Sequence, residues 1–121
     1  VLASHLTLPG RKRLEVARAL GARPKLLLLD EVMAGLRPTE TDEMVAFFRE
    51  INRDLGIGIL LIEHVMRFLV QLSSRVMIMH HGERIYEGPP DGLARDRTVV
   101  DVYLGEGASR RLAQFLEAKE R

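Results

Sequence analysis

The sequence predicts an α/β fold in which parallel strands form a sheet with helices on both of its sides. Three short segments, residues 26–29, 58–62 and 75–79, are almost continuously apolar, which is typical of strands buried on both faces. Segments with helical spacing of their apolar residues follow the first two strands, at 38–55 and 65–72. Helices that alternate with such strands indicate a parallel sheet.

Length and composition agree with one modest globular domain. The chain has 121 residues, of which 46% are hydrophobic, and this is enough to build a core. Its net charge is +1 with both signs spread along the chain, so we expect no nucleic-acid partner. It has no cysteine, and no apolar run approaches the roughly 18 residues of a membrane span. Because the chain starts with Val1 and not with methionine, we expect a piece of a longer protein.

Local signals set the expected elements of the first half. Residues 5–10 contain proline and glycine and are expected to form a loop, whereas the apolar stripe of residues 11–21 predicts a helix. Residues 32–37 are expected to be a loop after the first strand. Pro38 suits the first turn of the next helix, and Gly56 suits its end.

The second half is predicted to contain a hairpin and helices. Residues 80–83 are expected to turn the third strand into an alternating strand at 84–87. Residues 99–104 are expected to form a short helix. Residues 109–121 read as a charged amphipathic helix, which we expect to be an appendage and not part of the core.

Two adjacent acids, Asp30 and Glu31, follow the leucine strand. The carboxyl ends of parallel strands are where open α/β sheets bind ligands. There, one carboxylate can hold Mg²⁺ beside substrate phosphates, and the other can orient or deprotonate a water molecule. The alternative is that both acids only leave the core and start the next turn.

The order of motifs resembles the second half of an ATP-binding-cassette (ABC) ATPase. Residues 6–20 are similar to the signature motif and its helix, residues 26–31 to the Walker B strand, residues 34–37 to the D-loop, and His64 to the switch histidine. The stretches RLEVARAL, LLLDEVMAGLRPTE, LIEHVM and HHGERIYEGPP resemble the ATP-binding subunits of branched-chain amino acid importers. The resemblance implies that the chain forms part of the parallel sheet of a P-loop NTPase, flanked by helices. The strand that precedes the phosphate-binding loop would be missing from it.

The resemblance also implies roles for particular residues. Asp30 would bind Mg²⁺ through water, Glu31 would polarise the attacking water, and His64 would reach the γ-phosphate of ATP. For His64 the alternative is an ordinary turn residue. The neighbouring His80 and His81 are interpreted as turn residues, since adjacent histidines in a turn project apart.

The signature loop and the D-loop would contact ATP across a dimer of ATPases. Thr7 keeps the hydroxyl of the signature loop, and Gly10 stands where a glutamine is usual. Pro9 has no N–H to offer a phosphate. In the D-loop, the resemblance points to the residues Ala34, Gly35 and Leu36.

The resemblance implies ATP hydrolysis that drives import of branched-chain or other hydrophobic amino acids. The expected partners are a second ATPase subunit and two transmembrane permease subunits, with the chain itself peripheral, on the cytoplasmic face of the membrane. Residues 1–106 would be the carboxyl-terminal half of the ATPase domain and residues 107–121 a helical tail. Two alternatives remain: another ABC ATPase, such as a lipopolysaccharide exporter, and a truncated docking or dimerisation module without catalysis.

The chain contains no G-x-x-x-x-G-K-[ST] segment, the loop that cradles phosphates in such ATPases. We therefore expect the chain alone neither to bind ATP tightly nor to hydrolyse it. In the family, the strand before this loop lies between the strands equivalent to 58–62 and 75–79. Without it we expect a gapped sheet, an alternative pairing or marginal stability.

Overall fold

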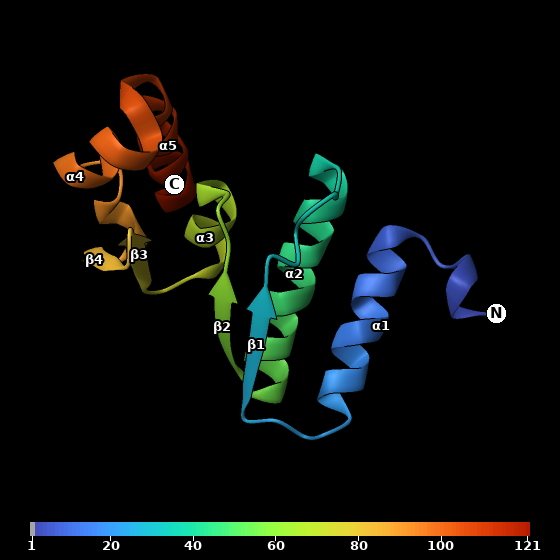
Figure 1. Ribbon diagram of the computed structural model, residues 1–121. Coiled ribbons are helices and arrows are strands. Elements are labelled where there is room, and N and C mark those ends of the chain that lie inside the picture. Colours follow the sequence, from blue (N-terminus) through green and yellow to red (C-terminus); the bar gives the residue numbers. More distant parts are fainter. Residues whose placement is uncertain (1) are drawn as a thin grey trace. The chain divides into compact units, whose positions relative to one another are not determined.

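The computed structural model describes residues 2–121, apart from the side chains at positions 104, 106 and 109. The chain forms two compact units, Val1–His64 and Val65–Arg121. Figure 1 shows the order of their elements along the chain. None of the described helices is long and apolar enough to cross a membrane.

The first unit contains a short parallel sheet. Its elements, in chain order, are η1 (Ala3–His5), α1 (Leu8–Leu20), β1 (Leu26–Asp30), α2 (Pro38–Leu55) and β2 (Gly58–Ile62). Strands β1 and β2 run parallel, with Leu26 opposite Gly58 and Asp30 opposite Ile62, so their carboxyl ends meet at one edge (Figure 1). The prediction of parallel strands with helices is confirmed for this unit.

Helix α1 begins three residues earlier than the sequence indicated. The hydroxyl oxygen of Thr7 accepts a hydrogen bond from the backbone N–H of Gly10 at 3.3 Å, which makes Thr7 the N-cap. Pro9 lies in the first turn, where a missing N–H breaks no helical hydrogen bond. The expected loop at 5–10 is therefore wrong beyond Thr7, because proline and glycine are tolerated at a helix start.

The core of the first unit comes from one stripe of α2 and one face of β1. Met44 and Phe48 of α2 are fully buried, and Leu27 and Leu29 of β1 are each 5% exposed. Helix α2 begins at Pro38 and ends at Gly56, whose φ of +64° is the left-handed conformation typical of a helix end. Both boundaries agree with the prediction.

The expected burial of these strands on both faces is not met by the residues that the structure describes. Along β1 the side chains alternate, and Leu26 and Leu28 are 55% and 67% exposed. On β2, Leu60 and Ile62 are exposed as well. Each leucine is apolar, but a strand is buried on both faces only where a second layer covers the sheet.

The second unit combines a hairpin with helices. Its elements are α3 (Met66–Leu72), β3 (Val76–His80), β4 (Glu83–Gly88), η2 (Pro90–Gly92), α4 (Arg97–Val99), the π-helical turn η3 (Val100–Leu104) and α5 (Gly105–Glu120). Strands β3 and β4 are antiparallel, as the hairpin prediction required. Among the described strands, β3 pairs with β4 and β2 pairs with β1. The expected arrangement of residues 58–62 and 75–79 stays a prediction, because these strands belong to different units.

Helix α5 belongs to the core of the second unit, which corrects the expectation of an appendage. Leu112 and Leu116 are buried in one cluster with residues of α3, β3 and α4, among them Val70 and Val76. The ammonium group of Lys119 donates a hydrogen bond to the carbonyl of Val70 at 2.7 Å. The apolar stripe of this helix is short, and its many charges hid its packing role in the sequence.

Candidate functional site

The carboxyl edge of the β1–β2 sheet brings Glu31 and His64 together. The backbone N–H of Glu31 donates to the carbonyl of Ile62 at 2.8 Å, which extends the ladder by one residue beyond β1. The Nδ1 atom of His64 lies 3.3 Å from Oε1 of Glu31. The two side chains are 54% and 68% exposed, so a ligand can reach both from solvent.

Glu31 has an unusual backbone conformation. Its φ is +48°, in the left-handed region that residues with a Cβ rarely adopt. Such conformations cost on the order of 1–3 kcal/mol and cluster at functional sites. The carbonyl of Glu31 accepts from the N–H of Ala34 at 3.2 Å, so the residue opens a tight turn directly after β1.

Sequence reasoning missed Glu63. Its Oε1 atom accepts a hydrogen bond from the backbone N–H of Met33 at 3.0 Å, and the contact is partly buried. Met33 is itself 4% exposed. The available signal was an acid between the last residue of an apolar strand and His64, a place where a carboxylate reaches the neighbouring strand end.

Asp30 is the last residue of β1 and its side chain is exposed. A single hard oxygen donor at a strand end fits Mg²⁺, which keeps several waters and takes one or two carboxylates beside substrate phosphates. The described residues contain no group of three or more His, Cys, Asp or Glu arranged to enclose a metal ion. Asp30 is thus an exposed carboxylate that could bind Mg²⁺ beside the phosphates of a nucleotide.

The predicted D-loop residues form the turn that follows. Ala34 and Gly35 are exposed and Leu36 is half-buried. Gly35 has a φ of +78°, and a Cβ atom at this position would lie 3.1 Å from Cδ2 of Leu8. The turn therefore approaches the first residue of α1, so the segments predicted to be the D-loop and the signature helix are neighbours within the first unit.

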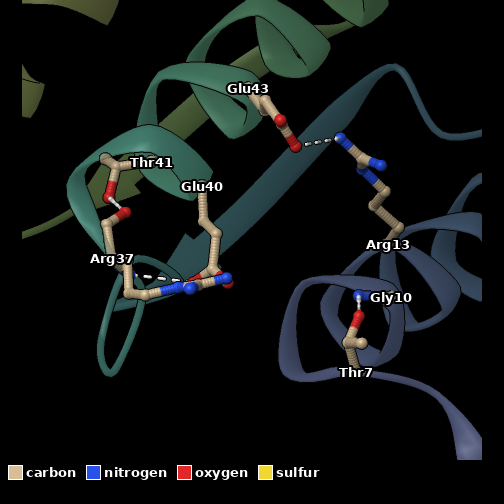
Figure 2. A network of polar contacts seen from close by, with 7 residues as sticks. All are labelled: Thr7, Gly10, Arg13, Arg37, Glu40, Thr41 and Glu43. Carbon is tan, nitrogen blue, oxygen red and sulfur yellow. Dashed lines mark hydrogen bonds and ion pairs between the residues drawn. The ribbon is translucent and has the colours of Figure 1, made fainter.

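Thr7 and Gly10 are brought together in the cap of α1 (Figure 2). The N–H of Gly10 is engaged by the Thr7 hydroxyl oxygen. The hydroxyl proton of Thr7 remains able to donate to an anion, because a hydroxyl group both donates and accepts. Of the two residues predicted to contact phosphate, Thr7 therefore keeps a free hydroxyl donor. The N–H of Gly10 is used in the cap of α1.

The start of α2 is fixed by Arg37 and Glu40. The carboxylate of Glu40 accepts from the backbone N–H of Arg37 at 2.9 Å and from its guanidinium at 2.7 and 3.0 Å (Figure 2). These bonds with Arg37 hold the pKa of Glu40 below its ordinary value. Thr41 donates to the Arg37 carbonyl at 2.9 Å. Arg37, the last residue of the predicted D-loop, thus directs its hydrogen bonds to the first turn of α2.

A polar link joins α1 to α2. A guanidinium nitrogen of Arg13 lies 3.6 Å from Oε2 of Glu43 (Figure 2). The guanidinium carbon of Arg13 lies 5.7 Å from the ring centre of Phe47. The exposed ion pair adds little stability, but the cation over an aromatic ring orients the helix that carries Thr7.

Known proteins share both the sequence and the fold of the chain, although no protein-family profile matches it. It is 35% identical over 104 residues to the high-affinity branched-chain amino acid transport ATP-binding protein BraF of Pseudomonas aeruginosa, covering 86% of this chain and 41% of BraF. It is 38% identical over 96 residues to the lipopolysaccharide export system ATP-binding protein LptB of Escherichia coli, covering 79% of this chain and 39% of LptB. The crystal structure of MJ1267, an ATP-binding cassette of an ABC transporter, in its ADP conformation matches with a TM-score of 0.75 and 29% identity, covering 84% of this chain and 41% of MJ1267.

The chain therefore belongs to the ABC transporter ATP-binding proteins. It spans about two fifths of the length of the curated relatives that it matches. Within the family it is similar to the branched-chain amino acid transport ATP-binding proteins, as the wording of its motifs indicated.

Proposed function

We propose that the chain supplies part of an ATP-hydrolysing site that drives transport across a membrane. The observation that carries the proposal is the 3.3 Å approach of His64 to Glu31 at the ends of two parallel strands. In the proposed site, this carboxylate and this imidazole would meet the attacking water and the terminal phosphate. Both side chains are open to solvent, as groups that meet a ligand must be.

In this proposal each residue at the sheet edge has a distinct task. Glu31 accepts a hydrogen bond from the attacking water and takes its proton, because a carboxylate is a competent general base. His64 donates a hydrogen bond to the γ-phosphate while its other nitrogen faces Glu31, which fixes the orientation of the ring. Asp30 would hold Mg²⁺, which when bound neutralises charge on the phosphates.

The signature loop and the D-loop would serve a second copy of the ATPase. Thr7 at the N-terminus of α1 offers a hydroxyl proton, and the helix dipole favours an anion there. Gly10 would contribute by allowing close approach, since its N–H is taken by Thr7. The turn at Ala34, Gly35 and Leu36 would contact the partner ATPase. Residues 1–106 would make up this part of the ATPase domain, and residues 107–121 would add a helix that packs into the core of the second unit.

The transported substrate is proposed from the relatives. BraF is named for branched-chain amino acid transport, and the chain is 35% identical to it over 86% of its own length. The proposed partners are a second ATPase subunit and two permease subunits, at the cytoplasmic face of a membrane. Export of lipopolysaccharide is the second candidate, because LptB is 38% identical over 79% of the chain.

The first test reads the coding sequence before Val1 for a phosphate-binding loop. We expect to find G-x-x-x-x-G-K-[ST] there, and a natural reading frame without it would favour a non-catalytic docking module.

In the natural polypeptide that contains this chain, we expect Glu31→Gln to lower kcat for ATP hydrolysis by about 100-fold or more, since the amide cannot take a proton. ATP binding, measured by calorimetry, should persist. Glu50→Gln, which removes the charge of an exposed acid on α2, is the control and should leave kcat unchanged. Normal turnover by Glu31→Gln would show that Glu31 is not the base.

A further inference from the structure

Three contacts join the segment after β1 to the end of β2 and the two residues that follow it. The N–H of Glu31 donates to the carbonyl of Ile62 at 2.8 Å, and Nδ1 of His64 lies 3.3 Å from Oε1 of Glu31. Between these two, the Glu63 carboxylate accepts from the N–H of Met33 at 3.0 Å. The Glu63 contact therefore links a side chain after β2 to a backbone N–H after β1.

The Met33 contact bears on the conformation of Glu31. A left-handed backbone at a residue with a Cβ persists only where its surroundings over-determine it, and Glu31 has a φ of +48°. On the N-terminal side of the turn, the ladder bond to Ile62 holds Glu31. Two residues later, the bond to Glu63 holds the backbone of Met33.

The chemistry of this bond suits a clamp. A hydrogen bond from a backbone N–H to an ionised carboxylate is about twice as strong as one between neutral groups. It is partly buried, so water competes for it less than for the exposed pair of His64 and Glu31. It also spans thirty positions of the chain, so it holds together parts that local structure does not join.

We propose that Glu63 is a positioning residue of the hydrolytic site. By holding the Met33 N–H, it keeps the turn after β1 in one conformation and so keeps the Glu31 carboxylate beside His64. This inference rests on the proposed function, because the position of Glu31 matters only if its carboxylate acts on a water. In this role Glu63 acts through the Met33 backbone and not directly on the reacting groups.

The test compares variants of the natural polypeptide that contains this chain. Glu63→Ala is expected to lower kcat for ATP hydrolysis by about 10- to 100-fold, the range for a displaced catalytic group. The KM for ATP should change by less than about twofold, because a residue that acts through the Met33 backbone affects the position of Glu31 and not the binding of the nucleotide. Glu63→Gln keeps an oxygen acceptor of the same reach and is expected to retain at least about a third of the wild-type kcat. Glu50→Ala is the matched control for loss of an acid and should retain full activity.

Hydrogen exchange at the Met33 amide reports the contact itself. Glu63→Ala should exchange this amide faster than wild type, and Glu63→Gln should stay close to wild type. Should Glu63→Ala not fold, Glu63→Asp keeps the charge but withdraws the carboxylate by one methylene, and we expect the same fall in kcat and the same faster exchange.

The outcomes separate the two proposals. Normal turnover in Glu31→Gln would overturn the proposed function and the positioning role with it. Loss of turnover in Glu31→Gln, with full kcat in a Glu63 variant whose Met33 amide exchanges fast, would leave the proposed function standing and overturn the role of Glu63. A lowered kcat in that variant at unchanged KM, with recovery in Glu63→Gln, would support both.

Discussion

At the scale of single residues, the backbone after β1 is shaped by two left-handed positions. Glu31 and Gly35 have φ values of +48° and +78°. Glycine adopts this conformation without strain, whereas glutamate does so against a steric penalty. The strained backbone conformation therefore falls on Glu31, the residue proposed to act on water. At Gly35, which only shapes the turn, a glycine adopts the same conformation without strain.

We predict that Gly35→Ala destabilises the fold by about 1–2 kcal/mol, the cost of a Cβ in left-handed backbone. The new Cβ would also lie 3.1 Å from Cδ2 of Leu8, so that methyl group must move. Gly56→Ala is the matched control, because Gly56 also has a positive φ but nothing lies within 4 Å of its added Cβ. Urea denaturation should show similar losses for both, while only Gly35→Ala changes the NMR shift of the Leu8 methyl. Wild-type stability of Gly35→Ala would contradict the prediction.

The residue scale also shows what the sequence could predict of the site. Asp30 and Glu31 were predicted because an apolar strand ends in them at the sheet edge, and His64 was predicted from the resemblance to the switch histidine. The structure brings Glu31 and His64 within 3.3 Å of each other. Glu63 was not identified, because its partner is a backbone N–H thirty positions away and no residue type marks that atom. The capping bond between Thr7 and Gly10 was missed for a related reason, since phosphate binding and helix capping favour the same residue types.

At the scale of elements, α5 shows how an apolar stripe decides the place of a helix. Its charged residues are numerous, yet Leu112 and Leu116 are 7% and 8% exposed in the cluster that fills the second unit. The bond from Lys119 to the Val70 carbonyl adds a polar link to α3. Charge density alone predicted an appendage, whereas spacing at i and i+4 was the better guide.

We predict that Leu116→Ala destabilises the second unit by about 2–5 kcal/mol, as expected when a buried leucine leaves a cavity. Leu55→Ala makes the same chemical change at the end of α2, where the leucine is 59% exposed, and should cost less than about 0.5 kcal/mol. Chemical denaturation followed by circular dichroism measures both. Equal, small effects would show that α5 is an appendage after all.

At the scale of the whole molecule, periodicity predicted the order of elements and left the coverage of the sheet open. Strand and helix positions follow from local patterns, so they were recovered along most of the chain. Burial on both faces of β1 and β2 was predicted wrongly. A continuous run of leucines favours burial, but only other elements packed on the sheet can cover its second face. The same limit applies to β3, which pairs with β4 in a hairpin and leaves Met77 and Met79 exposed.

The isolated chain is predicted to bind ATP weakly. Tight binding of the β- and γ-phosphates needs a glycine-rich loop with a lysine, and the sequence has none. Isothermal titration of the 121-residue chain with ATP and Mg²⁺ should show no micromolar affinity, and phosphate release should stay at background. A micromolar dissociation constant would mean that the residues described here form a nucleotide site unaided.

The uncovered face of the β1–β2 sheet has a thermodynamic consequence. Leu28 and Leu60 are paired in register and are 67% and 57% exposed. Leu26 and Ile62 are exposed to a similar degree. Water ordered around these aliphatic groups is already present before denaturation, so unfolding adds less apolar hydration than is usual for a chain of this size. The native state thus carries part of the heat capacity normally gained on melting. Its stability changes with temperature along a flatter curve as a result.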